Sequence, residues 1–318
     1  MKNVVVLGGG NGMSTLLKGL KLFPIKITSV VTVSDTGKST GRLREEFNMP
    51  AVGDIRRVIV SLSENEKYVD KLFNYRFNTN SDLDGHTIGN LLLTAATEVN
   101  GSLSKGVEYL SDVLSLKGTV LPLTEDNVEL MCETTNGKII EGEENITKSN
   151  SKIKRVFYKE NPKINEKVIN DIKHADLIIL SMGSIYTSVI PNLLCDEVKK
   201  AIDESKAKVL YILNLMTQPG ESENFNASKH IEILNEYLGN KKISLVLANN
   251  GKISKKIRKN YLVKEQKDPV FLDNKFLKNE NIKIKLNDYV KLENDTLIHN
   301  VEALALDIYS YLLFNRFN

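Results

Sequence analysis

The chain opens with a short apolar run that leads into glycines and then into a helical pattern. Residues 4–7 are Val-Val-Val-Leu, the glycine-rich stretch 8–12 follows, and a helical spacing of apolar side chains begins at once. A continuous apolar run is typical of a strand that is buried on both faces of a parallel sheet. Residues 27–33 (ITSVVTV) form a second such run, and helices are predicted over 54–75 and 88–100. Alternating strands and helices predict an α/β fold.

The alternation of strand and helix patterns resumes in the second half of the chain. Residues 176–180, 207–213 and 243–248 predict three further central strands, with helical segments near 184–205 and 228–239 between them. A closing helix is predicted from about 300 to 315. We therefore expect a Rossmann-like three-layer α/β/α architecture around a mainly parallel sheet, formed by residues 1–318 as one domain. Residues 250–318 are rich in Lys and Asn, and their pattern defines few elements.

Residues 119–158 do not show the alternation of strand and helix patterns found in the rest of the chain. They are rich in strand-forming side chains, and Thr135-Asn136-Gly137-Lys138 separates 128–134 from 139–140. Asn-Gly between two such runs is a strong signal for a hairpin turn. We expect an antiparallel excursion at the edge of the sheet, inside the same domain.

Composition narrows the class of protein. Apolar residues make up 41% and charged residues 26% of 318 residues, and the net charge is +3. This charge is too small to favour nucleic acid or an anionic membrane as a partner. Cys132 and Cys195 lie far apart and match no metal-ligand spacing, which suits a reducing compartment. With no signal peptide at the N-terminus and no apolar run of membrane-spanning length, we expect a cytoplasmic protein.

The glycine-rich stretch is the first candidate for chemistry. Glycines let the backbone approach an anion closely, and the helix that follows aims free N–H groups at it, so Gly8, Gly9, Gly10, Asn11 and Gly12 are expected to bind phosphate. The alternative is a tight strand-to-helix corner with no ligand. Met13 stands where the dinucleotide fingerprint G-x-G-x-x-G requires glycine, which disfavours an oxidoreductase.

A second glycine-containing stretch follows the next predicted strand. Residues 36–40 (TGKST) imitate a P-loop, but Thr32 takes the place of its first glycine. Lys38 therefore remains either a phosphate contact or a solvated lysine. Small and polar residues also follow the later strands, at 181–187, 214–220 and 249–251. Ligands of open parallel sheets bind beyond the carboxyl ends of the strands, so these stretches are expected to converge on one site.

Two carboxylates and a histidine segment complete the candidates. Asp35 follows strand two, and Asp54 opens a helix. Together they are expected to hold Mg²⁺ against a ligand phosphate. An Asx-turn for Asp35 and a helix cap for Asp54 are the alternatives. His86 and Asn90 stand at the start of a Leu-rich helix and are candidates for contacts to a phosphate, sugar or base. Equally, Thr87 caps this helix and His86 packs on it.

Six stretches together resemble a known family. In chain order they are GGGNGMSTLL, VSDTGKSTGRLR, VGDIR, GHTIGNLLL, MGSIYTSVIPNLL and NLMTQPGES, and they span most of residues 1–250. They are similar to the gluconeogenesis factor family (YvcK-like), which shares a superfamily with the 2-phospho-L-lactate transferases (CofD-like). The last 65 or so residues resemble the family only loosely.

The resemblance implies a Rossmann-like cytoplasmic protein that binds UDP-sugars such as UDP-N-acetylglucosamine. It also implies a role in cell shape and peptidoglycan-related growth on gluconeogenic carbon sources, with cell-wall synthesis or signalling proteins as partners and a homodimer as a possible assembly. The transferase relatives join phospholactate to a deazaflavin alcohol with Mg²⁺. The residues that the motifs carry over to the ligand cleft are Gly8–Gly12, Asp35, Asp54, Asn90, Gly183, Ser184, Asn214, Thr217, Gln218 and, as an aromatic position, Tyr261.

The chain departs from the family pattern at several of these places. Thr36 replaces a second Asp, Lys38 replaces a glycine, Met182 replaces a proline, and Ile298-His299-Asn300 stands for Arg-His-Asp. The site is rich in hydroxyl and amide donors and poor in acid–base pairs. We therefore expect a binding and regulatory protein that needs no cofactor, with Mg²⁺ accompanying the nucleotide. The alternative is a Mg²⁺-dependent enzyme that transfers a phospho group from a nucleotide-diphosphate conjugate.

Overall fold

A seven-stranded sheet runs through the centre of the structure, a computed structural model that describes residues 1–149, 151–293 and 296–317, with Lys38 described in its backbone only. All neighbouring strands of this sheet are parallel, in the order β10-β9-β8-β7-β1-β2-β3. The strands are β1 (Lys2–Gly8), β2 (Ile25–Val31), β3 (Thr119–Pro122), β7 (Leu177–Leu180), β8 (Lys208–Ile212), β9 (Ile243–Asn249) and β10 (Lys283–Asn287). The predicted α/β class with a mainly parallel sheet is confirmed.

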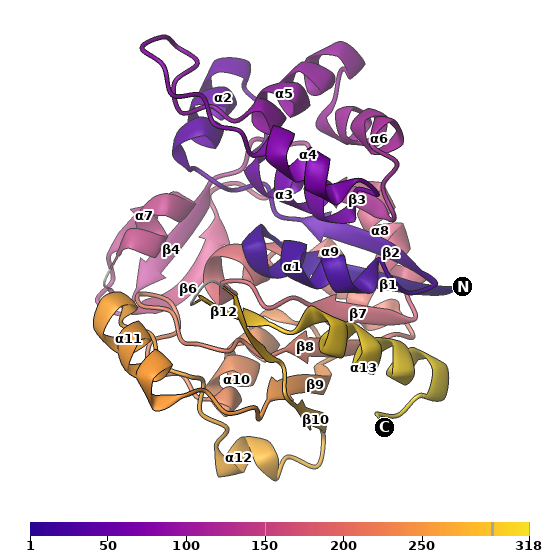
Figure 1. Ribbon diagram of the computed structural model, residues 1–318, viewed down its shortest axis with the longest axis vertical. Helices are drawn as coiled ribbons and strands as arrows, with labels where there is room; N and C mark the ends of the chain where they lie inside the picture. Colours follow the sequence, from indigo (N-terminus) through magenta and orange to yellow (C-terminus); the bar gives the residue numbers. More distant parts are fainter. Residues whose placement is uncertain (150, 294–295, 318) are drawn as a thin grey trace.

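Helices cover both faces of this sheet. In Figure 1, α1 and α13 lie in front of the strands and α8 and α9 lie behind them. The helices are α1 (Gly10–Leu20), α2 (Lys38–Phe47), α3 (Gly53–Leu62), α4 (Glu66–Phe73), α5 (Ile88–Asn100), α6 (Leu103–Val113), α7 (Glu143–Lys148), α8 (Glu166–Lys173), α9 (Asp196–Glu204), α10 (Ala227–Tyr237), α11 (Lys255–Glu265), α12 (Asn274–Leu277) and α13 (Val301–Phe314). Because helices pack on both faces, the central strands are mostly apolar, and Leu177–Leu180 are completely buried.

Two predicted helices differ from the observed ones. The helix expected over 54–75 is two helices, because Ser63 adopts an extended conformation (ψ 146°) that ends α3 and forms an antiparallel bridge with Leu116. The helical segment expected near 184–205 is a π-helical turn η1 (Ile185–Val189), a 3₁₀ turn η2 (Ile190–Leu193) and then α9. Pro191 lacks the amide hydrogen that a continuous α-helix requires there.

The strand-rich excursion is partly as predicted. Strands β4 (Leu130–Thr134) and β5 (Ile139–Glu141) form the expected antiparallel hairpin around Gly137, and β6 (Ile153–Tyr158) pairs with the other side of β4. These three strands form a sheet of their own. The expectation that the excursion covers all of 119–158 at the sheet edge is wrong, because β3 pairs in parallel with β2 and is itself the edge strand.

The C-terminal part supplies elements that the sequence pattern did not define. Strand β10 adds to the main sheet beside β9, and β11 (Val290–Glu293) pairs with β12 (Thr296–His299). The predicted closing helix is α13, and Gly19 of α1 allows it to pack closely, because a Cβ there would lie 2.5 Å from the carbonyl oxygen of Val301. In the part of the chain that the structure describes, no helix has the length and apolarity that crossing a membrane requires.

The strand order changes direction beside β1, and this places the ligand crevice of the fold. From β1 the chain proceeds to β2 and β3 on one side, and later from β7 to β8, β9 and β10 on the other. Open α/β sheets bind ligands beyond the carboxyl ends of the strands at such a switch point. There Gly10 has a positive φ of 62°, and a Cβ on Gly12 would lie 2.5 Å from the carbonyl oxygen of Met182.

The variant Gly12→Ala tests this packing. The added methyl group meets backbone rather than a flexible side chain, so we expect the free energy of unfolding to fall by about 2 kcal/mol in urea denaturation. Asn11→Ala, at an exposed position next to it, is the matched control and is expected to change little. Equal stability of the two variants would show that α1 does not pack on the turn after β7 in this way.

Candidate functional site

A cavity of about 620 Å³ opens at the carboxyl ends of β1, β2, β7 and β8. Most of its lining is polar, and it comes from segments that are far apart in the sequence. Its lining residues are Gly9, Gly10, Asn11, Gly12, Thr32, Asp35, Asp54, Arg57, Glu143, Met182, Gly183, Ser184, Thr187, Ser188, Asn214, Gln218, Lys267, Thr296, Leu297 and Ile298. We call this cavity the cleft. It brings together the glycine-rich stretch with the residues that follow three other strands.

The N-terminus of α1 forms one wall of the cleft. Gly9 occupies the N-cap position and has no side chain to cap the helix, the first turn contains no acidic residue, and the carboxylate of Asp54 from α3 accepts the backbone N–H of Gly10. The first backbone N–H groups of a helix have no partner within it and carry partial positive charge. Gly10, Asn11 and Gly12 therefore present amide groups of the kind that bind phosphate at helix N-termini.

Asp54 faces the same wall from α3. Its Oδ1 accepts a hydrogen bond from Nη1 of Arg57 at 2.5 Å, and both side chains line the cleft. Burial raises the pKa of Asp54, an effect that Arg57 opposes, while the nearby Asp35 carboxylate raises it further. Val52, not Asp54, occupies the N-cap position of α3, so the helix-cap interpretation of Asp54 is wrong.

Asp35 both closes a turn and lines the cleft. Its Oδ1 accepts the backbone N–H of Gly37 at 2.7 Å, and its Oδ2 accepts the hydroxyl of Thr40 at 3.3 Å. The Asx-turn that was the alternative for this residue is therefore present. Each oxygen keeps a lone pair beyond these bonds, so the turn leaves Asp35 able to bind a cation or a donor.

A third carboxylate, Glu143, enters the cleft from the excursion. It begins α7, which is held against the cleft because the hydroxyl of Thr36 accepts the backbone N–H of Glu144 at 3.0 Å. Burial raises the pKa of Glu143 to about 8, and the charges of Asp35 and Asp54 add to the shift. At neutral pH the Glu143 carboxyl is therefore mostly protonated and can donate a hydrogen bond.

Amide and hydroxyl groups form the opposite wall. The Oγ of Ser184 donates to Oε1 of Gln218 at 2.7 Å, and Nδ2 of Asn214 donates to the carbonyl oxygen of Gly183 at 3.0 Å. These bonds join the turn after β7 to the turn after β8. Thr187 lies on the π-helical turn η1, a distortion that often occurs at functional sites.

Several predicted site residues lie away from the cleft. His86 and Asn90 both bind Oγ of Ser39, each at 3.1 Å, in a buried network beneath α2. Thr87 caps α5 by accepting the backbone N–H of Asn90, as the alternative interpretation held. Neither His86 nor Asn90 lines the cleft, and Oδ1 of Asn90 is buried without a hydrogen-bond partner among the described residues.

Three other predicted residues, Gly8, Thr217 and Tyr261, do not line the cleft but bind residues that line it or lie next to them. The side chain of a fourth, Lys38, is not described. Gly8 is buried behind the lining, where its carbonyl oxygen accepts from the Thr32 amide. Thr217 exchanges two hydrogen bonds with the backbone of Asp268, next to Lys267. The hydroxyl of Tyr261 accepts the amide of Leu297 at 2.8 Å. The side chain of Lys38 lies outside the described part of the chain.

Sequence reasoning missed Arg57, Glu143, Lys267 and residues 296–297, whereas Ile298 stands where the family pattern has arginine. A signal for Arg57 existed, because it follows Asp54 by three residues on the same helix face. Glu143 and Lys267 arrive from segments whose position depends on tertiary packing, and no local pattern marks them. Among the residues that the structure describes, no group of three or more His, Cys, Asp and Glu side chains is arranged to hold a metal ion.

Comparison with known proteins places the chain in a family. The family model described as 2-phospho-L-lactate transferase CofD matches residues 4–290. The gluconeogenesis factor of Halalkalibacterium halodurans is 41% identical over 307 residues, which cover 96% of this chain and 94% of that protein. The gluconeogenesis factor of Bacillus subtilis is 40% identical, with 95% of each chain covered.

A solved structure shows the same architecture. The crystal structure of a protein from Bacillus halodurans superposes with a TM-score of 0.93 at 40% sequence identity and covers 97% of this chain and 99% of its own. The expected resemblance is therefore confirmed. This chain belongs to the gluconeogenesis factor family, within the larger CofD family.

Proposed function

We propose that this protein binds a nucleotide-diphosphate sugar of the UDP-N-acetylglucosamine type in the cleft and serves as a regulatory protein. The observation that carries the proposal is the N-terminus of α1, which faces a polar cavity at the switch point of the sheet and whose Gly10 amide already binds the carboxylate of Asp54. Backbone amides at this position suit a diphosphate. The hydroxyl and amide groups of Ser184, Asn214 and Gln218 opposite it suit a sugar, whose hydroxyls both donate and accept hydrogen bonds.

The biological setting of the proposal comes from the relatives. The proteins from H. halodurans and B. subtilis carry the name gluconeogenesis factor, and they match this chain over nearly all of its length. In our proposal the ligand-bound state acts in the cytoplasm on proteins of cell-wall synthesis or signalling and supports cell shape during growth on gluconeogenic carbon sources.

The charges of the cleft give the proposal a role for Mg²⁺. Arg57 pairs with Asp54, and Lys267 pairs with Glu265 outside the cleft, so the lining offers a diphosphate little net positive charge while Glu143 is protonated. The carboxylates of Asp35 and Asp54 are suitable ligands for Mg²⁺, which binds one or two carboxylates together with phosphate oxygens. When bound, the ion would supply the positive charge that allows these two acids and a diphosphate to share one cavity.

One observation favours a second function, a transferase that acts on a nucleotide-diphosphate conjugate. Glu143 has a pKa of about 8 and faces the same cavity as two further carboxylates. A carboxyl group tuned to this range can exchange a proton near neutral pH, as general acid–base catalysis requires. The match to the 2-phospho-L-lactate transferase model agrees with this alternative.

The primary test is ligand-dependent thermal stability. A ligand that binds only the folded state raises the melting temperature, by the equivalent of about 2.7 kcal/mol at a hundredfold excess over Kd. We expect UDP-N-acetylglucosamine with Mg²⁺ to raise it by several degrees, while NAD and GTP do not. Failure of every UDP-sugar at millimolar concentration to shift the transition would contradict the proposal.

The variant Asp35→Asn separates binding from turnover. Asparagine keeps an oxygen for the amide of Gly37, so the turn survives while the charge is lost. We expect UDP-N-acetylglucosamine to bind about tenfold more weakly in Mg²⁺ by calorimetry, because a metal ligand is removed. Asp196→Asn, at an exposed position on α9, is the control. If the wild type instead forms product from a nucleotide conjugate and Asp35→Asn abolishes it, the transferase is the better account.

The ionisation of Glu143 is testable through stability in the absence of metal and ligand. Its folded-state pKa of about 8 lies above the ordinary value of 4.5, so between these pH values the folded protein holds a proton that the unfolded chain has released. The free energy of unfolding should therefore fall as pH rises through this window, by about 2 kcal/mol relative to Glu143→Gln. Glu144→Gln, whose carboxylate pairs with Lys148 at the surface, should track the wild type. Parallel profiles for the wild type and Glu143→Gln would contradict the clustering of three acids.

A further inference from the structure

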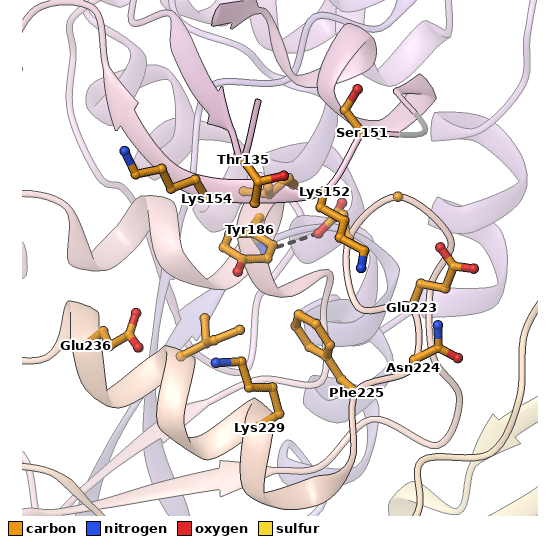
Figure 2. A pocket seen from close by; sticks show the side chains of 14 residues that line it. Thr135, Ser151, Lys152, Lys154, Tyr186, Glu223, Asn224, Phe225, Lys229 and Glu236 are labelled. Atoms are coloured by element: carbon orange, nitrogen blue, oxygen red, sulfur yellow. Dashed lines mark hydrogen bonds between the residues drawn. The ribbon is translucent and has the colours of Figure 1, made fainter. Parts of the chain in front are cut away.

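A second cavity lies between the three-stranded sheet and α10 (Figure 2). Its volume is about 380 Å³, which is within the usual range for small-molecule sites. None of its lining residues lines the cleft. The lining residues are Thr135, Ser151, Lys152, Ile153, Lys154, Tyr186, Gly220, Glu221, Glu223, Asn224, Phe225, Lys229, Ile233 and Glu236. We call it the α10 pocket.

The charges of the α10 pocket are balanced and of both signs. Lys154 and Lys229 form ion pairs with Glu133 and Glu232, both at 2.6 Å and both outside the pocket. The backbone carbonyl of Lys152 accepts the amide of Thr135, but its ammonium has no hydrogen-bond or ion-pair partner among the described residues, and in Figure 2 the side chain lies on the same side of the pocket as Glu223. One free ammonium and one free carboxylate on the same side match a small zwitterion whose ammonium and carboxylate groups are attached to the same carbon atom.

The middle of the pocket is apolar. Tyr186, Phe225 and Ile233 line it from three different segments, namely η1, the loop after β8 and α10. The ring of Phe225 is half-buried and stands edge-on to His230, with 5.9 Å between ring centroids. Aromatic and branched walls of this kind favour a ligand with an apolar side chain or ring.

We propose that the α10 pocket binds a small zwitterion with an apolar side chain, of the class of an aromatic amino acid, and that its occupancy changes the ligand affinity of the cleft. The binding part stands on the pocket alone. The coupling part rests on the proposed function of the cleft.

Glu221 provides the first connection between the two cavities. Its side chain is buried, and the residue lines the α10 pocket. Its Oε1 accepts hydrogen bonds from Oγ1 of Thr187 at 2.8 Å and from Nε2 of Gln218 at 3.2 Å, both of which line the cleft. Its Oε2 accepts the backbone N–H of Tyr186, the bond drawn in Figure 2. A ligand that moves Tyr186 or Glu221 therefore strains or breaks the hydrogen bonds that Glu221 makes with two residues of the cleft.

His230 provides the second connection. Nδ2 of Asn214 donates to the carbonyl oxygen of Gly183, so the other end of this amide, Oδ1, faces Tyr211. Oδ1 of Asn214 accepts the hydroxyl hydrogen of Tyr211 at 2.9 Å. Nδ1 of His230, 3.0 Å from the same hydroxyl, must then be the donor, since a hydroxyl has one hydrogen. Phe225 in the α10 pocket packs on His230, and Asn214 lines the cleft. A chain of four side chains thus joins the two cavities.

The binding test uses L-phenylalanine as the probe, with the wild-type protein and calorimetry in the absence of nucleotide. Three analogues each lack one feature: 3-phenylpropionate lacks the ammonium, phenethylamine lacks the carboxylate, and glycine lacks the ring. We expect L-phenylalanine to bind and each analogue to bind about fivefold more weakly or not at all. No binding of L-phenylalanine at 10 mM, or equal binding of an analogue, would overturn the proposal.

Variants locate the binding. Lys152→Ala and Glu223→Ala change exposed side chains, so both are expected to fold, and each should weaken L-phenylalanine binding about fivefold. Lys159→Ala is the matched control, because Lys159 is also exposed and lies outside the pocket. Equal affinity in Lys152→Ala and Lys159→Ala would overturn the assignment of this pocket.

Coupling has two readouts. Saturating L-phenylalanine should change the Kd of UDP-N-acetylglucosamine about fivefold or more, and the nucleotide sugar must change the Kd of L-phenylalanine by the same factor. Hydrogen exchange of residues 183–188 should also change when L-phenylalanine binds alone, which needs no nucleotide. Unchanged exchange in residues 183–188 would overturn the coupling, whether or not UDP-sugars bind. The proposal that the α10 pocket binds L-phenylalanine would not be affected by that result.

Discussion

The close approach of two backbones at the switch point of the sheet is the constraint on which the rest depends. Only a residue without a Cβ fits at Gly12, because the carbonyl of Met182 occupies that space. This contact fixes the N-terminus of α1 against the turn that follows β7. Asn192 supports it from η2 by donating to the carbonyl of Gly8 at 3.1 Å. The helix end, the cleft and the amide wall opposite all take their positions from this packing.

Electrostatics then determine what the cleft can hold. Three carboxylates and two cationic side chains share a partly buried space, and burial raises the pKa of Asp54 and Glu143. A carboxyl group that holds its proton near neutral pH is a hydrogen-bond donor rather than a repelling charge. The same group is suited to regulation by ligand or metal, because either changes its ionisation. The buried carboxyl of Glu221, whose pKa burial raises to about 7, lies between this cleft and the α10 pocket.

Much of the fold could be predicted from the sequence, because the central strands are buried on both faces and are therefore mostly apolar. The hairpin around Gly137 was equally clear, since its turn is local. Strand β3 was assigned to the antiparallel excursion, because its parallel pairing with the distant strand β2 leaves no local signal. Strand β10 was not identified, because it is partly exposed and has no continuous apolar run. The glycine-rich stretch, Asp35 and Asn214 could be assigned to the cleft from their places after strands, whereas Glu143 and Lys267 depend on how distant segments pack. His86 and Asn90 show the converse, because they stand at a polar helix start but bind Ser39 and do not line the cleft.

A crystal structure of the protein with UDP-N-acetylglucosamine and Mg²⁺ is the most direct test of the central claim. The account predicts density for the diphosphate against the backbone amides of Gly10–Gly12, with the sugar toward Ser184 and Gln218. Density for the nucleotide at another surface, or a cleft left empty in crystals that contain saturating ligand, would contradict it.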